Sequence, residues 1–171
     1  MATDIFMSIE TEEGDSITEG AGTKESIGAY YKSEHEDDIY VLGFEQKASI
    51  ATDRLSGQIT SSRRHEYLRV TKLVDKASPL LYQLLAEPKG LNCVISFFRS
   101  ADTGSDGQPV HFYSIELEGA KIVAINTVSP NILDARYDDY VAYEEVTLTF
   151  NSITWNHETA SSTTTDNWSG E

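Results

Sequence analysis

Tyr113-Ser114-Ile115-Glu116-Leu117-Glu118 alternates apolar and polar side chains without a break. Successive side chains of a β-strand point to opposite faces, so this period of two predicts a strand with one buried face. The runs 5–9 and 146–151 alternate in the same way. Further runs are rich in the β-branched and aromatic residues that favour strands; they are Ile39–Phe44, Tyr67–Val74, Cys93–Arg99, Ala120–Val128 and Ile153–Trp155.

Turn-forming residues separate these runs at short intervals, for example Gly14-Asp15 and Ser129-Pro130-Asn131. Many short strands joined by turns are typical of antiparallel sandwiches and barrels, whereas alternating strands and helices would indicate a parallel sheet. The sequence therefore predicts a mainly β protein in which two antiparallel sheets form a small β-barrel or sandwich. A chain of 171 residues suits one such domain, which we place at 1–158.

The remaining residues, 159–171, are mostly Ser, Thr, Asp and Asn. This composition is typical of a loose polar tail. Trp168 is the exception, because its indole needs an apolar site either on a late strand or on a neighbouring chain.

One segment, from about Ser78 to Glu87, is predicted to form the main α-helix. Ser78 suits the capping position, and Pro79 suits the first helical position, where its missing N–H costs nothing. A helix of this length is marginal alone, so its apolar face must dock on the sheet. The leucines at helical spacing that we expect to dock are Leu81, Leu84 and Leu85.

Composition excludes several classes of function. The net charge of −15 argues against nucleic acid and anionic membranes as partners, since both need basic surface. No apolar run approaches the roughly 20 residues that span a bilayer. The N-terminal sequence lacks the basic and apolar regions of a signal peptide, so any export is expected without a cleaved leader.

The sequence offers no motif for catalysis or for a metal. Gly-x-Ser-x-Gly, P-loop and Rossmann patterns are absent, and the single cysteine, Cys93, lies in an apolar run that favours an inert core thiol. The histidines lack the spacing of a metal site; they are His35, His65, His111 and His157. We therefore expect no enzyme activity, metal or cofactor.

Tyrosines suggest a carbohydrate-binding face as an alternative, against the commoner roles of strand packing and interfaces. These residues are Tyr30, Tyr31, Tyr137, Tyr140 and Tyr143. The acidic, tyrosine-rich stretch Asn131–Tyr143 has no assigned place.

Motifs along nearly the whole chain resemble those of the Hcp family, the haemolysin-coregulated proteins of type VI secretion systems. The stretch Asp75–Tyr82, at the predicted helix, is the most specific of them. The other motifs lie on both sides of it and occur along the chain in the family's order: Asp4–Glu10 with Gly14, Glu34–Asp37, Thr52–Gln58, Arg64-His65, Val110–Tyr113, Glu145–Leu148, Ile153–Trp155 and Asp166–Trp168.

This resemblance implies a small barrel flanked by a helix, six copies of which form a ring. Rings of this family stack into a tube inside a contractile sheath, so the implied partners are further copies, sheath, spike and effector proteins. The tube subunit is expected in the bacterial cytoplasm before firing and outside the cell afterwards. The family has no catalytic residues to carry over.

The loop Ala51–Arg64 is our candidate for contacts between subunits or rings. Residues 51–100 hold eight basic and four acidic side chains, whereas the rest of the chain is strongly acidic. The alternative is that its charges are merely solvated, because most surface pairs contribute little. The candidate contact residues are Arg54, Leu55, Gln58, Arg63 and Arg64.

Two other functions remain open from the sequence. One is a ring protein of a related phage-tail-like particle, with the same fold but another delivery system. The other is a β-sandwich hydrolase or a carbohydrate-binding module, which would be monomeric.

Overall fold

The alternating run at 113–118 lies in the longest strand of the computed structural model, β5 (Val110–Val128). The structure describes residues 3–101 and 107–169. The helical elements are short: α1 (Lys24–Ile27), η1 (Gly28–Tyr30), α2 (Ser78–Ala86) and η2 (Ala135–Tyr137). The other strands are β1 (Asp4–Thr11), β2 (Ile39–Ser49), β3 (Arg64–Leu73), β4 (Leu91–Arg99), β6 (Tyr143–Thr149), β7 (Ser152–His157) and β8 (Ser162–Asn167).

The strands form one antiparallel sheet in the order β4-β1-β2-β3-β6-β5-β7-β8. An additional pairing between β4 and β5 closes the first six of these into a barrel. The mainly β barrel with one main helix is confirmed, but the two predicted sheets are continuous. The reason is the length of β5, which pairs with β4 and β7 through its first half and with β6 through its second half.

The predicted alternation matches the burial along β5. Ile115 and Leu117 are buried in the core, whereas Glu116 and Glu118 are exposed. The equivalent positions Val146 and Leu148 on β6 are also buried. Burying each such side chain stabilises the fold by about 1.5–3 kcal/mol, which makes the inward row the main source of stability.

Helix α2 begins at Ser78, one residue earlier than we predicted. Ala77 occupies the capping position, so the prediction that Ser78 caps the helix is wrong. Ser78 is the first helical residue, and its hydroxyl instead accepts a 3.0 Å hydrogen bond from the backbone N–H of Asp75. Of the three predicted docking leucines, Leu81 and Leu84 are buried in the core and Leu85 packs half-buried against it.

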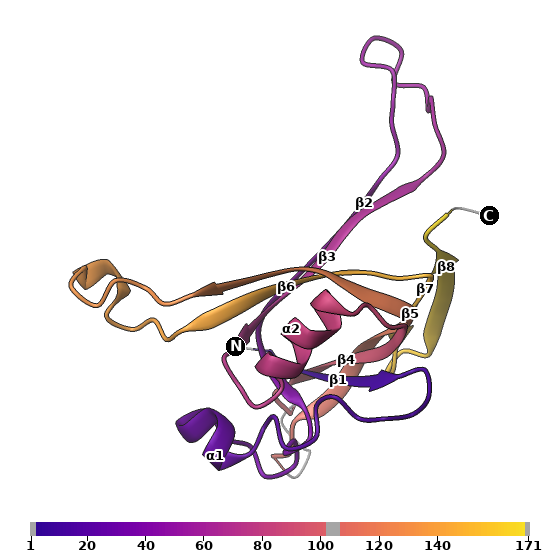
Figure 1. Ribbon diagram of the computed structural model, residues 1–171. Coiled ribbons are helices and arrows are strands. Elements are labelled where there is room, and N and C mark those ends of the chain that lie inside the picture. Colours follow the sequence, from indigo (N-terminus) through magenta and orange to yellow (C-terminus); the bar gives the residue numbers. More distant parts are fainter. Residues whose placement is uncertain (1–2, 102–106, 170–171) are drawn as a thin grey trace.

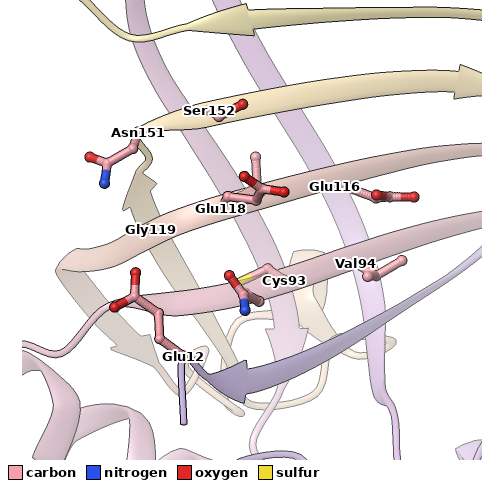
Figure 2. Close-up of a pocket in the computed structure, with 10 residues that line it drawn as sticks. Glu12, Cys93, Val94, Glu116, Glu118, Gly119, Asn151 and Ser152 are labelled. Carbon is pink, nitrogen blue, oxygen red and sulfur yellow. The ribbon is translucent and has the colours of Figure 1, made fainter. Parts of the chain in front are cut away.

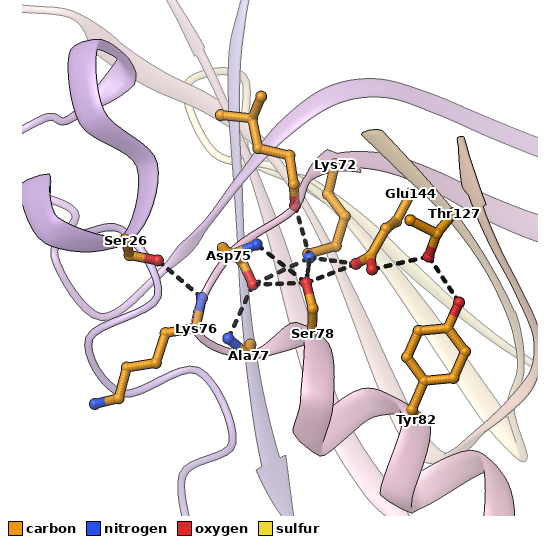
Figure 3. A network of polar contacts seen from close by, with 10 residues as sticks. Ser26, Lys72, Asp75, Lys76, Ala77, Ser78, Tyr82, Thr127 and Glu144 are labelled. Carbon is orange, nitrogen blue, oxygen red and sulfur yellow. Dashed lines mark hydrogen bonds and ion pairs between the residues drawn. The ribbon is translucent and has the colours of Figure 1, made fainter. Parts of the chain in front are cut away.

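A buried polar network joins α2 to the barrel (Figure 3). The Lys72 ammonium on β3 lies 2.9 Å from Glu144 on β6 and 3.0 Å from Asp75. The Ser78 hydroxyl donates a 2.7 Å hydrogen bond to Glu144. Beyond Glu144, the network continues to Thr127 and to Tyr82 on α2. It therefore ties the helix to β3, β5 and β6.

Two carboxylates share this one ammonium, and their pKa values shift in opposite directions. Burial raises the pKa of Asp75, although Lys72 partly offsets it. Burial also disfavours charge on Glu144, but hydrogen bonds from Lys72 and Ser78 outweigh it and lower the pKa of that carboxyl.

The prediction of a loose tail is wrong for residues 162–167. They form β8, which pairs with β7 along its whole length. Four of its six residues are Ser or Thr, and β-branched Thr fits a pleated surface although it is polar. Trp168 then packs on the core, with its ring 4.9 Å from that of Phe150 and 5.8 Å from that of His65.

Two hairpin ends project well beyond the barrel and in different directions (Figure 1). The first, Ala51–Arg64, joins β2 to β3, and we call it the β2–β3 arm. The second, residues 129–142, joins β5 to β6 and contains η2, and we call it the β5–β6 arm. The unassigned tyrosine-rich stretch forms most of this second arm.

Candidate assembly surfaces

The tip of the β2–β3 arm is a pre-formed turn built around Asp53. Its carboxylate accepts hydrogen bonds of 2.9 and 2.7 Å from the backbone N–H groups of Leu55 and Ser56. The Asp53 N–H donates to the carbonyl of Gln58 at 2.8 Å. The hydrogen bonds from Ser56 and Leu55 lower the pKa of Asp53, so the turn is made by the charged carboxylate.

This turn brings together three of the five predicted contact residues, Arg54, Leu55 and Gln58. The side chain of Leu55 is 100% exposed. Arg54 forms no ion pair within the described residues. An ordered turn that holds an apolar and a cationic side chain in water is suited to bind another surface.

The other two predicted residues lie at the base of the arm and differ from one another. Arg63 forms an ion pair with Asp166 on β8, and the same carboxylate lies 3.0 Å from Nε2 of His65. Arg63 therefore fastens β8 to the arm within the chain. Arg64 is exposed. Hydrogen bonds from Lys47 and Ser49 lower the pKa of Glu66, and the charge of Arg64 makes a smaller contribution in the same direction.

The β5–β6 arm is also ordered at its end. The Asp134 carboxylate accepts a 3.1 Å hydrogen bond from the backbone N–H of Arg136 and so caps η2. Tyr137 and Tyr140 pack edge to face, 5.5 Å apart. Ile132 is nevertheless 89% exposed at the end of this arm.

The candidate tyrosines do not form one face. Tyr31 donates a hydrogen bond to Glu36, and Arg136 lies over the ring of Tyr137. The remaining three line a depression of about 390 Å³ between β2 and the inner end of the β5–β6 arm. We call it the tyrosine pocket; its main lining residues are Tyr30, Leu42, Asp139, Tyr140, Val141, Tyr143 and Glu145.

A second, larger depression of about 550 Å³ lies on strands β4 and β5 and is acidic (Figure 2). Glu116 and Glu118 on β5 and Glu12 beyond the end of β1 surround it. Cys93 lies beneath it, buried, and burial raises the pKa of its thiol to about 12. A thiol with this pKa is not a nucleophile near neutral pH.

The histidines are dispersed among aromatic rings. His35 stacks on Phe6 with ring centroids 3.6 Å apart, and His111 stacks on Phe98 at 4.9 Å. In the parts of the chain that the structure describes, no group of three His, Cys, Asp or Glu side chains is placed to hold a metal. No helix among those residues is long and apolar enough to cross a membrane.

The model of the family "type VI secretion system effector, Hcp" matches residues 6–157. The chain belongs to the Hcp family. The "Major exported protein" of Pseudomonas aeruginosa is 38% identical over 98% of this chain and 96% of its own length. A "Crystal structure of Hcp protein" has a TM-score of 0.89 and 31% identity, over 98% of both chains. The "Secreted protein Hcp3 from Pseudomonas aeruginosa" has a TM-score of 0.76 and 32% identity, over 96% of this chain and 99% of its own.

Membership in the Hcp family places the chain among type VI secretion tube proteins, a structural and not an enzymatic family. The functional features of this Hcp chain are therefore its exposed surfaces.

Sequence reasoning missed two of these features. It did not pair Arg63 with Asp166, because the two residues are 103 positions apart and meet only when β8 folds back. It also missed the tyrosine pocket, whose residues come from η1, β2, β3, β6 and the β5–β6 arm. The Tyr-rich composition of 137–143 was the available signal.

Proposed function

We propose that this Hcp chain is a structural subunit of a type VI secretion tube. Six copies close into a ring, rings stack into a tube, and the tube is exported with sheath, spike and effector proteins as partners. Its subunits act in the cytoplasm until the tube is fired. Export of the Pseudomonas aeruginosa relative, named a major exported protein, supports this route.

The observation that carries the proposal is the tip of the β2–β3 arm. Asp53 holds it in one shape while Leu55 stays fully exposed. An exposed leucine on an ordered projection gains free energy when another surface covers it. A contact between different surfaces of identical chains forms a ring if the rotation closes and a stack or filament if it does not.

Native mass spectrometry of the purified full chain tests the ring. We expect a dominant species at six times 19.0 kDa. A strict monomer at high protein concentration would contradict the proposal and favour a monomeric β-sandwich module instead.

A further inference from the structure

We propose that the tip of the β2–β3 arm binds in the tyrosine pocket of a second copy of this chain. Leu55 fills the pocket, and Arg54 pairs with the carboxylates of Asp139 and Glu145 at its rim. This inference rests on the proposed stacking of rings and names the two surfaces that meet there.

Shape supports this pairing. Leu55 is a fully exposed apolar side chain, and covering it in a cavity with apolar walls is favourable. The tyrosine pocket offers about 390 Å³, lined by the side chains of Leu42, Tyr140 and Val141, each of which is exposed. Covering both surfaces removes apolar area from water on each of the two copies.

Charge supports it as well. Arg54 precedes Leu55 and forms no ion pair in the described chain, while Asp139 and Glu145 lack one there too. The acidic depression on β4 and β5 also attracts a cation, but carboxylates surround it, whereas apolar and aromatic side chains line most of the tyrosine pocket. A leucine next to an arginine therefore fits the tyrosine pocket better.

The positions of the two surfaces explain why they meet between copies. Leu42 lies near the start of β2, and Leu55 lies in the turn beyond the bridge between Thr52 and Ile59, at the far end of the arm that β2 leads into. Leu55 lies thirteen positions after Leu42, which corresponds to a distance of at most roughly 40 Å at the rise of a β-strand. A chain of this stiffness cannot fold its tip back into its own pocket. Head-to-tail contact between copies then repeats at roughly 40 Å, and it forms a stack where the rotation between copies does not close a ring.

Disulfide trapping tests the contact. The variant Leu55→Cys/Val141→Cys is assembled and treated with diamide, which accepts the two electrons released as the thiols join. The native Cys93 is buried, with a pKa of about 12, so it does not compete. The matched control is Leu55→Cys/Leu133→Cys, which puts the second thiol on an 88% exposed leucine outside the pocket.

We expect covalent ladders of two and more chains from the pocket variant and at least about tenfold less from the control. Trapping at Leu133 but not at Val141 would overturn the inference. If neither variant is trapped although the wild type stacks, another partner covers the tip and the inference also fails. If the wild type forms no stacks at all, the proposed function itself fails.

A second pair of variants checks the energetics. Leu55→Asp is expected to raise the protein concentration needed for stacking by at least about tenfold, since it replaces the leucine that the contact would bury with a charge next to acidic residues. Leu133→Asp, an equal change on the other arm, should leave that concentration unchanged. Rings of both variants should keep the wild-type mass. Equal effects of the two changes would overturn the inference.

Discussion

Lys72 on β3 and Glu144 on β6 form a buried ion pair, with 2.9 Å between Nζ and Oε2 and side-chain exposures of 1% and 3%. Their strands are neighbours in the barrel, and the pair also reaches Ser78 at the start of α2. The sequence gives no sign of this pair, because Lys72 lies in a run that reads as an ordinary strand. Its position makes it the polar connection between the helix and the base of the β5–β6 arm.

Replacing Lys72 by Met is expected to destabilise the fold by about 3–5 kcal/mol, because Asp75 and Glu144 are then left as buried charges without a cation. Lys47→Met is the control, since Lys47 is 54% exposed and pairs with Glu66 at the surface. That change should have a much smaller effect on the free energy of unfolding, because the pair is exposed to solvent. Urea unfolding measures both. Similar costs for the two variants would show that the buried pair has no special role.

The raised pKa of Asp75 predicts a specific pH dependence. The folded chain holds a proton on Asp75 at pH values where the unfolded chain, with an ordinary pKa of about 3.9, has lost it. The stability that Asp75 contributes therefore falls as the pH rises from about 4 through the raised pKa. The free energy of unfolding of the wild type minus that of Asp75→Asn should decrease over this window, as followed by urea titration at a series of pH values.

Glu144→Gln provides the opposite case. Because the pKa of Glu144 is lowered, its contribution is present above the ordinary value of about 4.3 and is lost as the pH falls through the lowered pKa. The advantage of the wild type over Glu144→Gln should thus shrink in acid. If both differences changed in the same direction with pH, the assignment of the two carboxyls would be wrong.

Trp168→Ala is expected to destabilise the barrel by about 2–4 kcal/mol, somewhat below the range for a fully buried tryptophan. The indole packs on Phe150 and His65 and thereby holds the end of β8 against the core. Thr164→Ala, an exposed change on β8 itself, should cost less than about 1 kcal/mol. Thermal unfolding separates the two, and equal midpoints would mean that Trp168 is not part of the core in solution.

Charge reversal at the arm should weaken assembly in a salt-dependent way. In Arg54→Glu/Arg64→Glu, we expect reduced stacking, with the largest difference from the wild type at low salt, where screening is least. Arg63 is left intact because its ion pair with Asp166 is internal. Light scattering at several ionic strengths follows the stacking. Unchanged scattering at low salt would support the view that these arginines are simply solvated.

Local patterns in the sequence were sufficient for the barrel and for α2, because alternation and leucine spacing report directly on burial. They failed at β8. Thr164 and its neighbours have the composition of a polar tail, but pairing with β7 makes them a strand. They also placed Arg63 and Arg64 in one contact surface, although Arg63 points to Asp166. Such partners are distant in sequence, so only the fold reveals them.

Head-to-tail assembly of identical copies is the proposed mode of action of this Hcp chain. Electron microscopy of the purified wild-type protein at high concentration tests it. We expect six-fold rings that stack with an axial repeat of roughly 40 Å, set by the length of the β2–β3 arm. Single particles of one 19.0 kDa chain, without rings, would contradict it.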